Sequence, residues 1–230
     1  MLHYRSVNMS MMRMGTVWRF CIGLVLLISL NPAGTSGAFT SDREANVTAL
    51  ERRSETRIDA GTFLVAAPDM KDPRFFQAVI LMVQHDLAGS AGVVINRPSE
   101  LELAKHLFPG QEKKLGSERF VFWGGPVAMQ EMVCLMQLKE DIPGTKQIFG
   151  DVYITSSRRV LDQFIGTRGP DNLFRIYMGY AGWSAGQLAA EIAQGRWQVM
   201  PADAKTIFET PADEIWSSLM RDREADRISI

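Results

Sequence analysis

The stretch of sequence that decides the fold is Gly179-Tyr180-Ala181-Gly182-Trp183-Ser184-Ala185-Gly186-Gln187-Leu188. It follows an apolar segment, residues 173–178, which is expected to be a strand. Ser184 and Gln187 have the S-x-x-Q spacing of a capping box, in which the two side chains satisfy backbone donors of a first helical turn. Glycines at 179 and 182 permit backbone angles or close approaches that a Cβ would prevent. The stretch therefore predicts a tight strand-to-helix corner.

Apolar segments on both sides of this corner predict the other elements. The expected strands are 62–67, 78–85, 91–96, 120–123, 132–138, 152–155 and 207–208, and the expected helices are 100–107, 158–165, 185–194 and 213–222. The segment 78–85 is apolar at six successive positions, which is typical of a strand buried on both faces. A short polar turn joins it to 91–96, so the two strands should form a hairpin. Hairpins without a regular strand-helix-strand cadence favour a mixed-sheet α/β or α+β domain over a doubly wound parallel sheet.

The start of the chain has the pattern of a targeting segment. Arg13 and Arg19 precede an apolar core over residues 20–30, and the small residues 36–38 resemble a cleavage site. The core is shorter than the roughly 20 apolar residues that a membrane span needs.

We therefore expect residues 1–38 to be a cleaved signal peptide or an uncleaved membrane anchor, 39–58 a polar linker and 59–230 the folded domain. The expected location is the periplasm, or the membrane through residues 20–30. A cytoplasmic protein whose start has been assigned too early is the alternative.

The overall composition limits the classes of partner and cofactor. The 230 residues carry a formal net charge of -1, which provides no basic footprint for nucleic acid, so DNA is not an expected partner. Only Cys21 and Cys134 occur, and Cys21 lies in the leader, so the mature form is expected to have no internal disulfide and a buried thiol at Cys134. His85, His106 and Cys134 lack the spacing of metal ligands. Phosphate-loop motifs are missing from the sequence, and we expect neither a metal nor a cofactor.

Four blocks of sequence follow one another along the expected domain. They are Gly61–Pro68 with Asp72-Pro73-Arg74-Phe75; His85, Gly89, Gly92 and Val94-Ile95-Asn96-Arg97-Pro98; Trp123-Gly124-Gly125-Pro126-Val127; and Gly179–Trp183 with Gly186-Gln187-Leu188, Glu191 and Trp197. On these blocks the sequence resembles the YqgE/AlgH family of bacterial proteins.

The resemblance implies an α+β fold with a mixed, bifurcated, partly barrel-like sheet and flanking helices. It implies no established reaction, cofactor or metal. The family is often labelled as transcriptional regulators, a label that comes from a genetic association with alginate control rather than from a DNA-binding motif.

One motif points to catalysis. Gly182-Trp183-Ser184-Ala185-Gly186 matches the G-x-S-x-G elbow of serine hydrolases. In α/β-hydrolases the histidine base follows the serine in the chain, and no histidine follows residue 106 here. Ser184 is better explained as a helix cap that pairs with Gln187.

The preferred hypothesis is a non-enzymatic binding or regulatory module for an unidentified protein or small-molecule partner. Its candidate surface consists of His85, Asn96, Arg97, Gly124, Gly125, Tyr180, Gly182 and Trp183. A purely structural interpretation of these residues, in which the polar ones fold loops and the aromatic ones fill the core, stays open. Two functional alternatives also stay open: a cytoplasmic transcriptional regulator, and a hydrolase that uses Ser184.

Overall fold

The computed structural model describes residues 58–110, 115, 120–167 and 173–228. All of these residues belong to one compact unit, Ser41–Ile230. The expected leader, and the expected linker apart from Ile58, lie outside the described residues. Within the described part of the chain, no helix is long and apolar enough to cross a membrane.

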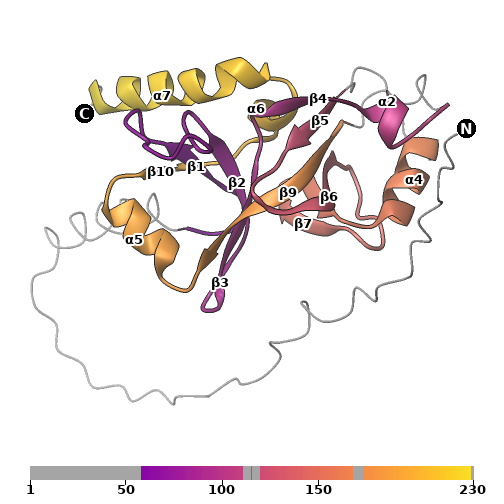
Figure 1. The fold of residues 1–230 in the computed structure, drawn as a ribbon, viewed down its shortest axis with the longest axis horizontal. Coiled ribbons are helices and arrows are strands. Elements are labelled where there is room, and N and C mark those ends of the chain that lie inside the picture. The colour runs from indigo at the N-terminus through magenta and orange to yellow at the C-terminus, as the bar shows by residue number, and fades with distance from the viewer. Residues whose placement is uncertain (1–57, 111–114, 116–119, 168–172, 229–230) are drawn as a thin grey trace, which may run out of the picture. The chain divides into compact units, whose positions relative to one another are not determined.

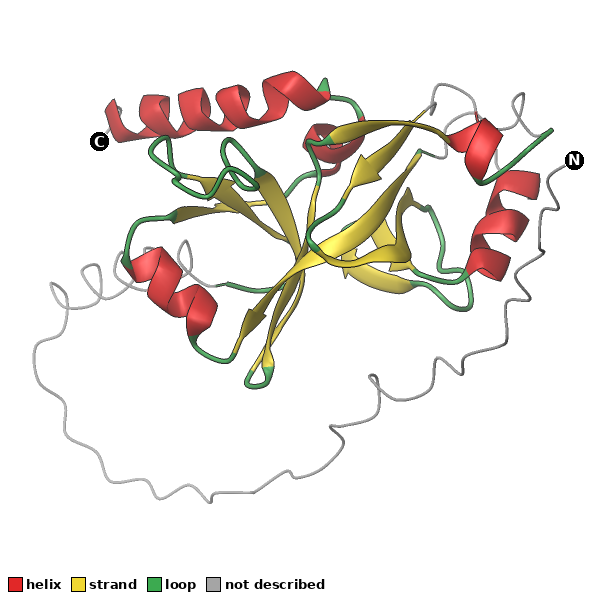
Figure 2. Ribbon diagram, viewed as in Figure 1, coloured by secondary structure: helices red, strands yellow, loops and turns green. Residues whose placement is uncertain are grey.

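The described elements are mostly strands, as Figure 2 shows. The strands are β1 (Thr62–Ala66), β2 (Val79–Asp86), β3 (Gly89–Val94), β4 (Pro98–Glu102), β5 (Phe120–Trp123), β6 (Val127–Gln137), β7 (Lys146–Phe149), β8 (Val152–Thr155), β9 (Phe174–Ser184) and β10 (Trp197–Pro201). The helices are α2 (Leu103–His106), α4 (Arg158–Thr167), α5 (Gln187–Ala193), α6 (Ala204–Phe208) and α7 (Ala212–Ile228).

The strands form one mixed, curled sheet that divides at β9. Its order is β10-β1-β2-β3-β9-β6-β8-β7, and β4 joins through β5, which pairs with β9 in parallel. The first part of β9 pairs with β5 and β6, whereas residues 181–184 pair with β3. Figure 1 shows β9 crossing from one half of the sheet to the other. The expected α+β fold with a bifurcated, partly barrel-like sheet is confirmed.

The predicted strand-to-helix corner lies later in the chain than expected. β9 does not stop at residue 178 but continues through the glycines to Ser184. Gly179 has a φ of +74°, and a Cβ there would lie 2.5 Å from the carbonyl oxygen of Gly125. The glycine therefore allows another stretch of backbone to cross the strand, and the strand is not broken.

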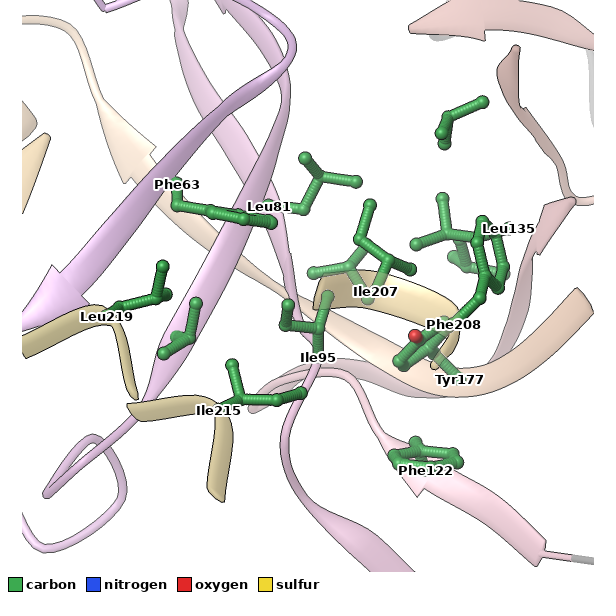
Figure 3. Packing of buried hydrophobic residues seen from close by; sticks show 14 of the residues in the cluster. Phe63, Leu81, Ile95, Phe122, Leu135, Tyr177, Ile207, Phe208, Ile215 and Leu219 are labelled. Carbon is green, nitrogen blue, oxygen red and sulfur yellow. The ribbon is translucent and has the colours of Figure 1, made fainter. Parts of the chain in front are cut away.

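Three clusters of buried side chains fill the two halves of the sheet. The first joins β1, β2 and β3 to α6 and α7, and Figure 3 shows Phe63, Leu81 and Ile215 among its members. The second packs α4 against β6 and β9 and contains the fully buried Cys134, as the sequence predicted. The third joins α5 and β10 to β1 and β2 and contains Trp183. This third cluster supports the candidate site.

Several sequence-based assignments differ from the structure. Residues 207–208 end helix α6 instead of forming a strand, because Asp203 caps that helix by accepting a hydrogen bond from the backbone nitrogen of Thr206 at 2.8 Å. The expected helix 100–107 begins as strand β4, which pairs with β5, and only its second half is helical. Strands β7 and β10 were not predicted. Both are edge strands, and their pairing depends on contacts with distant segments.

A side-chain hydrogen bond joins helix α7 to strand β1, and a single substitution can remove it. The indole nitrogen of Trp216 donates to the carbonyl oxygen of Ala66 at 2.8 Å. Trp216→Phe keeps most of the ring and removes this donor, so we expect the free energy of unfolding to fall by about 1 kcal/mol. Urea denaturation followed by circular dichroism measures the change. An unaltered midpoint would contradict a stabilising role for this bond.

Candidate functional site

An open pocket of about 260 Å³ lies at the C-terminal end of β9. We call it the Trp183 pocket. Its walls come from the segment between β1 and β2, the start of β6, the end of β9, helix α5 and the start of β10. The lining residues are Met70, Asp72, Arg74, Phe75, Pro126, Val127, Gly182, Trp183, Gln187, Glu191, Arg196 and Trp197.

The carboxylate of Glu191 holds one side of the pocket together. Its Oε2 accepts hydrogen bonds from the indole nitrogens of Trp183 at 3.0 Å and Trp197 at 2.8 Å. Its Oε1 accepts from Nε2 of Gln187 at 3.0 Å. Both indoles are buried, and their rings meet edge to face with centroids 6.0 Å apart. One acidic side chain therefore fixes the positions of two tryptophans from different elements.

These hydrogen bonds also determine the charge of Glu191. Burial alone would raise the pKa of this carboxyl, but the hydrogen bonds from Trp197, Gln187 and Trp183, together with the nearby charge of Arg196, outweigh burial. The pKa is therefore lowered from its ordinary value of 4.5. A general acid that works near neutral pH needs a raised pKa, so the environment of Glu191 suits a structural anion.

The segment between β1 and β2 contributes an aromatic ring and an ion pair to the pocket. Phe75 contacts Trp197 edge to face, with ring centroids 5.6 Å apart. Arg74 binds Asp72 through two hydrogen bonds, Nε to Oδ1 at 3.0 Å and Nη2 to Oδ2 at 2.6 Å. The hydrogen bond from Arg74 lowers the pKa of Asp72. Arg196 also lines the pocket and is exposed.

Gly182 and Trp183 are the members of the predicted candidate surface that line the pocket. Asn96 and Arg97 do not line the pocket but bind the segment that follows Phe75. Nδ2 of Asn96 donates to the carbonyl oxygen of Gln77 at 2.9 Å, and Nη2 of Arg97 donates to that of Phe76. The buried Asn96 also accepts from the backbone nitrogen of Val79 at 2.9 Å. The two side chains thereby hold the segment that carries Phe75.

Gly124, Gly125 and Tyr180 lie where the segment before β6 crosses the backbone of β9, next to the pocket. A Cβ on Gly125 would lie 2.1 Å from the carbonyl carbon of Tyr180, and one on Gly124 would lie 2.3 Å from the carbonyl oxygen of Gly179. Only glycines allow so close an approach. The crossing brings Val127 opposite Tyr180 and places it beside the pocket.

His85 lies on the β2–β3 hairpin and does not line the pocket. Its Nδ1 is 2.7 Å from the hydroxyl oxygen of Ser90. Ser90 in turn pairs with Trp183 across β3 and β9. His85 is therefore connected to the site through a neighbouring strand.

The predicted cap at Ser184 and Gln187 takes a different form in the structure. Ser184 ends β9, and helix α5 begins at Gln187 with Gly186 as its N-cap, in the left-handed region and without a side-chain cap. Oε1 of Gln187 accepts from the backbone nitrogen and the hydroxyl of Ser184, at 3.1 and 3.2 Å. Because Gln187 also donates to Glu191, the contact joins the corner to the tryptophans. Among the described residues, the histidine that contacts a serine is His85, and its partner is Ser90, which gives the hydrolase hypothesis for Ser184 no support.

The candidate surface drawn from the sequence omitted Phe75, Glu191 and Trp197. All three stand in the blocks that carry the family resemblance. One pattern in the sequence could have identified Glu191. It lies four residues after Gln187, so the two side chains share one face of the expected helix. Within the described residues, no group of three or more His, Cys, Asp and Glu side chains could hold a metal ion.

Comparisons with known proteins agree on one family. The family model described as AlgH-like matches residues 63–227. A UPF0301 protein of Azoarcus sp. (strain BH72) is 38% identical over 156 residues, which cover 66% of this chain and 82% of the relative. A UPF0301 protein of Xylella fastidiosa (strain 9a5c) is 39% identical over 171 residues, which cover 73% of this chain and 87% of the relative.

Two solved structures are similar to this chain. The solution structure of the AlgH protein from Pseudomonas aeruginosa matches with a TM-score of 0.59 and 34% identity, and the match covers 70% of this chain and 87% of that one. The crystal structure of a Corynebacterium diphtheriae protein matches with a TM-score of 0.64 and 22% identity, and covers 73% of this chain and 88% of that one. At that identity the second match concerns the fold alone.

Proposed function

The chain belongs to the AlgH-like family, and on this premise we propose that its domain is a non-enzymatic binding module whose ligand enters the Trp183 pocket. The observation that carries the proposal is the meeting of separate sequence blocks at this pocket. The lining residues from these blocks are Asp72, Arg74, Phe75, Pro126, Val127, Gly182, Trp183, Gln187, Glu191 and Trp197. These segments lie far apart in the chain. In the fold they meet around an open pocket that their side chains do not fill.

The composition of the walls suits a ligand. Aromatic and aliphatic side chains line the pocket beside polar groups, most of which hydrogen bonds hold in place, and such a combination is usual in a binding site. The backbone next to the walls is also strained, since Gln77 and Ala128 have positive φ angles of 54° and 47°. Gln77 follows Phe75 closely, and Ala128 follows Val127. Strained residues of this kind cluster at functional sites.

The chemistry of the pocket groups favours binding over catalysis. The oxygens of Glu191 are used by two indoles and an amide, and its pKa is lowered. The hydroxyl of Ser184 meets an amide oxygen. A nucleophile needs a neighbouring base that can take its proton. An amide oxygen cannot serve as that base.

Gly182→Leu is expected to abolish binding without unfolding the domain. The nearest atom to a Cβ at this exposed position is 3.4 Å away, on the ring of Tyr180, so the new side chain fits and occupies the pocket. The probes are phenylacetate, benzylamine and benzyl alcohol, titrated into ¹⁵N-labelled protein. At least one should shift the indole N–H signals of Trp183 and Trp197 to saturation. In Gly182→Leu its affinity should fall more than about tenfold.

Ala190→Leu is the matched control, because it adds the same side chain to an exposed position of α5 that does not line the pocket. This variant should bind like the wild type. The proposal fails if none of the three probes moves the two indole signals, or if Gly182→Leu leaves their titration unchanged.

A further inference from the structure

The size of the Trp183 pocket limits what can enter it. Its volume of about 260 Å³ is below the range of about 300–1,000 Å³ that is usual for whole drug-sized ligands. Met70, Phe75, Pro126 and Val127 give it apolar walls. The pocket therefore suits one bulky apolar group, such as a single aromatic or branched aliphatic side chain.

The charged group at the pocket that remains available to hydrogen-bond a ligand is the guanidinium of Arg196, although its charge also stabilises the Glu191 carboxylate. Asp72 and Arg74 neutralise each other, and the oxygens of Glu191 face Trp183, Trp197 and Gln187. The guanidinium of Arg196 is exposed and, among the residues that the structure describes, has no hydrogen bond or ion pair to a side chain. It offers five N–H donors beside the apolar hollow. A ligand with negative charge next to its apolar group complements this arrangement.

The segments that line the pocket also carry exposed apolar side chains. Phe76, Val127 and Met129 are exposed by 47%, 38% and 55%, and each belongs to or adjoins a segment that lines the pocket. Aromatic residues and methionine are enriched in the surfaces through which proteins bind one another. The ligand should therefore extend past its anchoring group, as a polypeptide does.

We infer that the Trp183 pocket binds an acidic peptide segment of a partner protein, with one bulky apolar side chain of that segment in the pocket and its carboxylates facing Arg196. This inference rests on the proposed function and adds the chemical class of the ligand. The apolar side chain supplies the buried anchor, as in other interfaces whose affinity is concentrated in a few residues. The carboxylates supply orientation and selectivity.

Three synthetic peptides test the inference by titration into ¹⁵N-labelled full-length protein. They are acidic Ser-Asp-Glu-Trp-Glu-Asp-Ser, basic Ser-Lys-Arg-Trp-Arg-Lys-Ser, and Ser-Asp-Glu-Ser-Glu-Asp-Ser, which lacks the anchor. We expect the acidic peptide to shift the indole signals of Trp183 and Trp197 and to bind at least about tenfold more tightly than either of the others. Arg196→Glu should weaken the acidic peptide by at least about tenfold and make the basic peptide the tighter ligand.

Arg221→Glu is the control, since it changes the net charge equally at an exposed position of α7, which contributes no lining residue. Equal affinity for the acidic and basic peptides, or an unchanged preference in Arg196→Glu, would overturn the inference. If aromatic fragments move the indole signals while no peptide does so, the binding site stands and the peptide assignment fails. If neither moves them, both proposals fail.

Discussion

Gly125→Ala is expected to lower the free energy of unfolding by about 4 kcal/mol, or to prevent folding altogether, because it adds both backbone strain and a steric clash. Gly125 has a φ of +151°, and its Cβ would lie 2.1 Å from the carbonyl carbon of Tyr180 and 2.4 Å from the backbone nitrogen of Ala181. Both obstacles are backbone atoms of β9, so no rotation of a side chain can relieve them. Urea denaturation followed by far-ultraviolet circular dichroism measures the loss.

Gly182→Ala is the control for Gly125→Ala, because Gly182 lies in β9, the strand that Gly125 crosses. Its new methyl group meets nothing closer than 3.4 Å, so we expect a change within about 0.5 kcal/mol. Similar losses in the two variants would contradict the crossing and would point to a general intolerance of side chains in this region. A loss confined to Gly125→Ala would establish that the third and fourth sequence blocks meet backbone to backbone.

The sequence predicted most strands correctly but misjudged β9, for a physical reason. Two glycines in five residues commonly end a strand, and a helix signal followed them. In the structure Gly179 instead makes room for the backbone of Gly125, which lies more than fifty residues earlier. Local patterns carry no information about such a crossing. The sequence alone predicted that the strand ends at residue 178, whereas in the structure it continues to Ser184.

The same limit applies to the candidate site. The sequence singled out Gly182 and Trp183, and both line the pocket. It did not place Trp197 beside them, because Trp197 begins β10, an edge strand whose pairing with Ala66 of β1 joins distant parts of the chain. Once β10 is placed, Glu191 lies between the two tryptophans. The residues of the site were thus visible in the sequence blocks, but their convergence required the tertiary structure.

Glu191→Ala is expected to destabilise the domain by about 2–3 kcal/mol. The substitution leaves the indole donors of Trp183 and Trp197 without their acceptor, and each unsatisfied buried donor costs about 1–3 kcal/mol. The expected total loss of stability is at the lower end of the sum for two donors, because the pocket is open and water can reach part of the vacated space. Urea denaturation at pH 7 measures the change. The indole N–H signals of both tryptophans should also shift, since each loses a charged partner.

Glu191→Gln separates the charge of the side chain from its shape. The amide keeps one acceptor oxygen for the indoles, so at pH 7 the loss should be about 1 kcal/mol. Because the pKa of Glu191 is lowered in the folded state, its charge stabilises the fold above the ordinary value of 4.5, and this contribution disappears as the pH falls through the folded-state pKa. The stability difference between wild type and Glu191→Gln should therefore be constant from pH 7 to about 5 and shrink at lower pH. A difference that grew on acidification would mean that the pKa of Glu191 is raised in the folded protein, so the hydrogen bonds from the two tryptophans would not outweigh the burial of its charge.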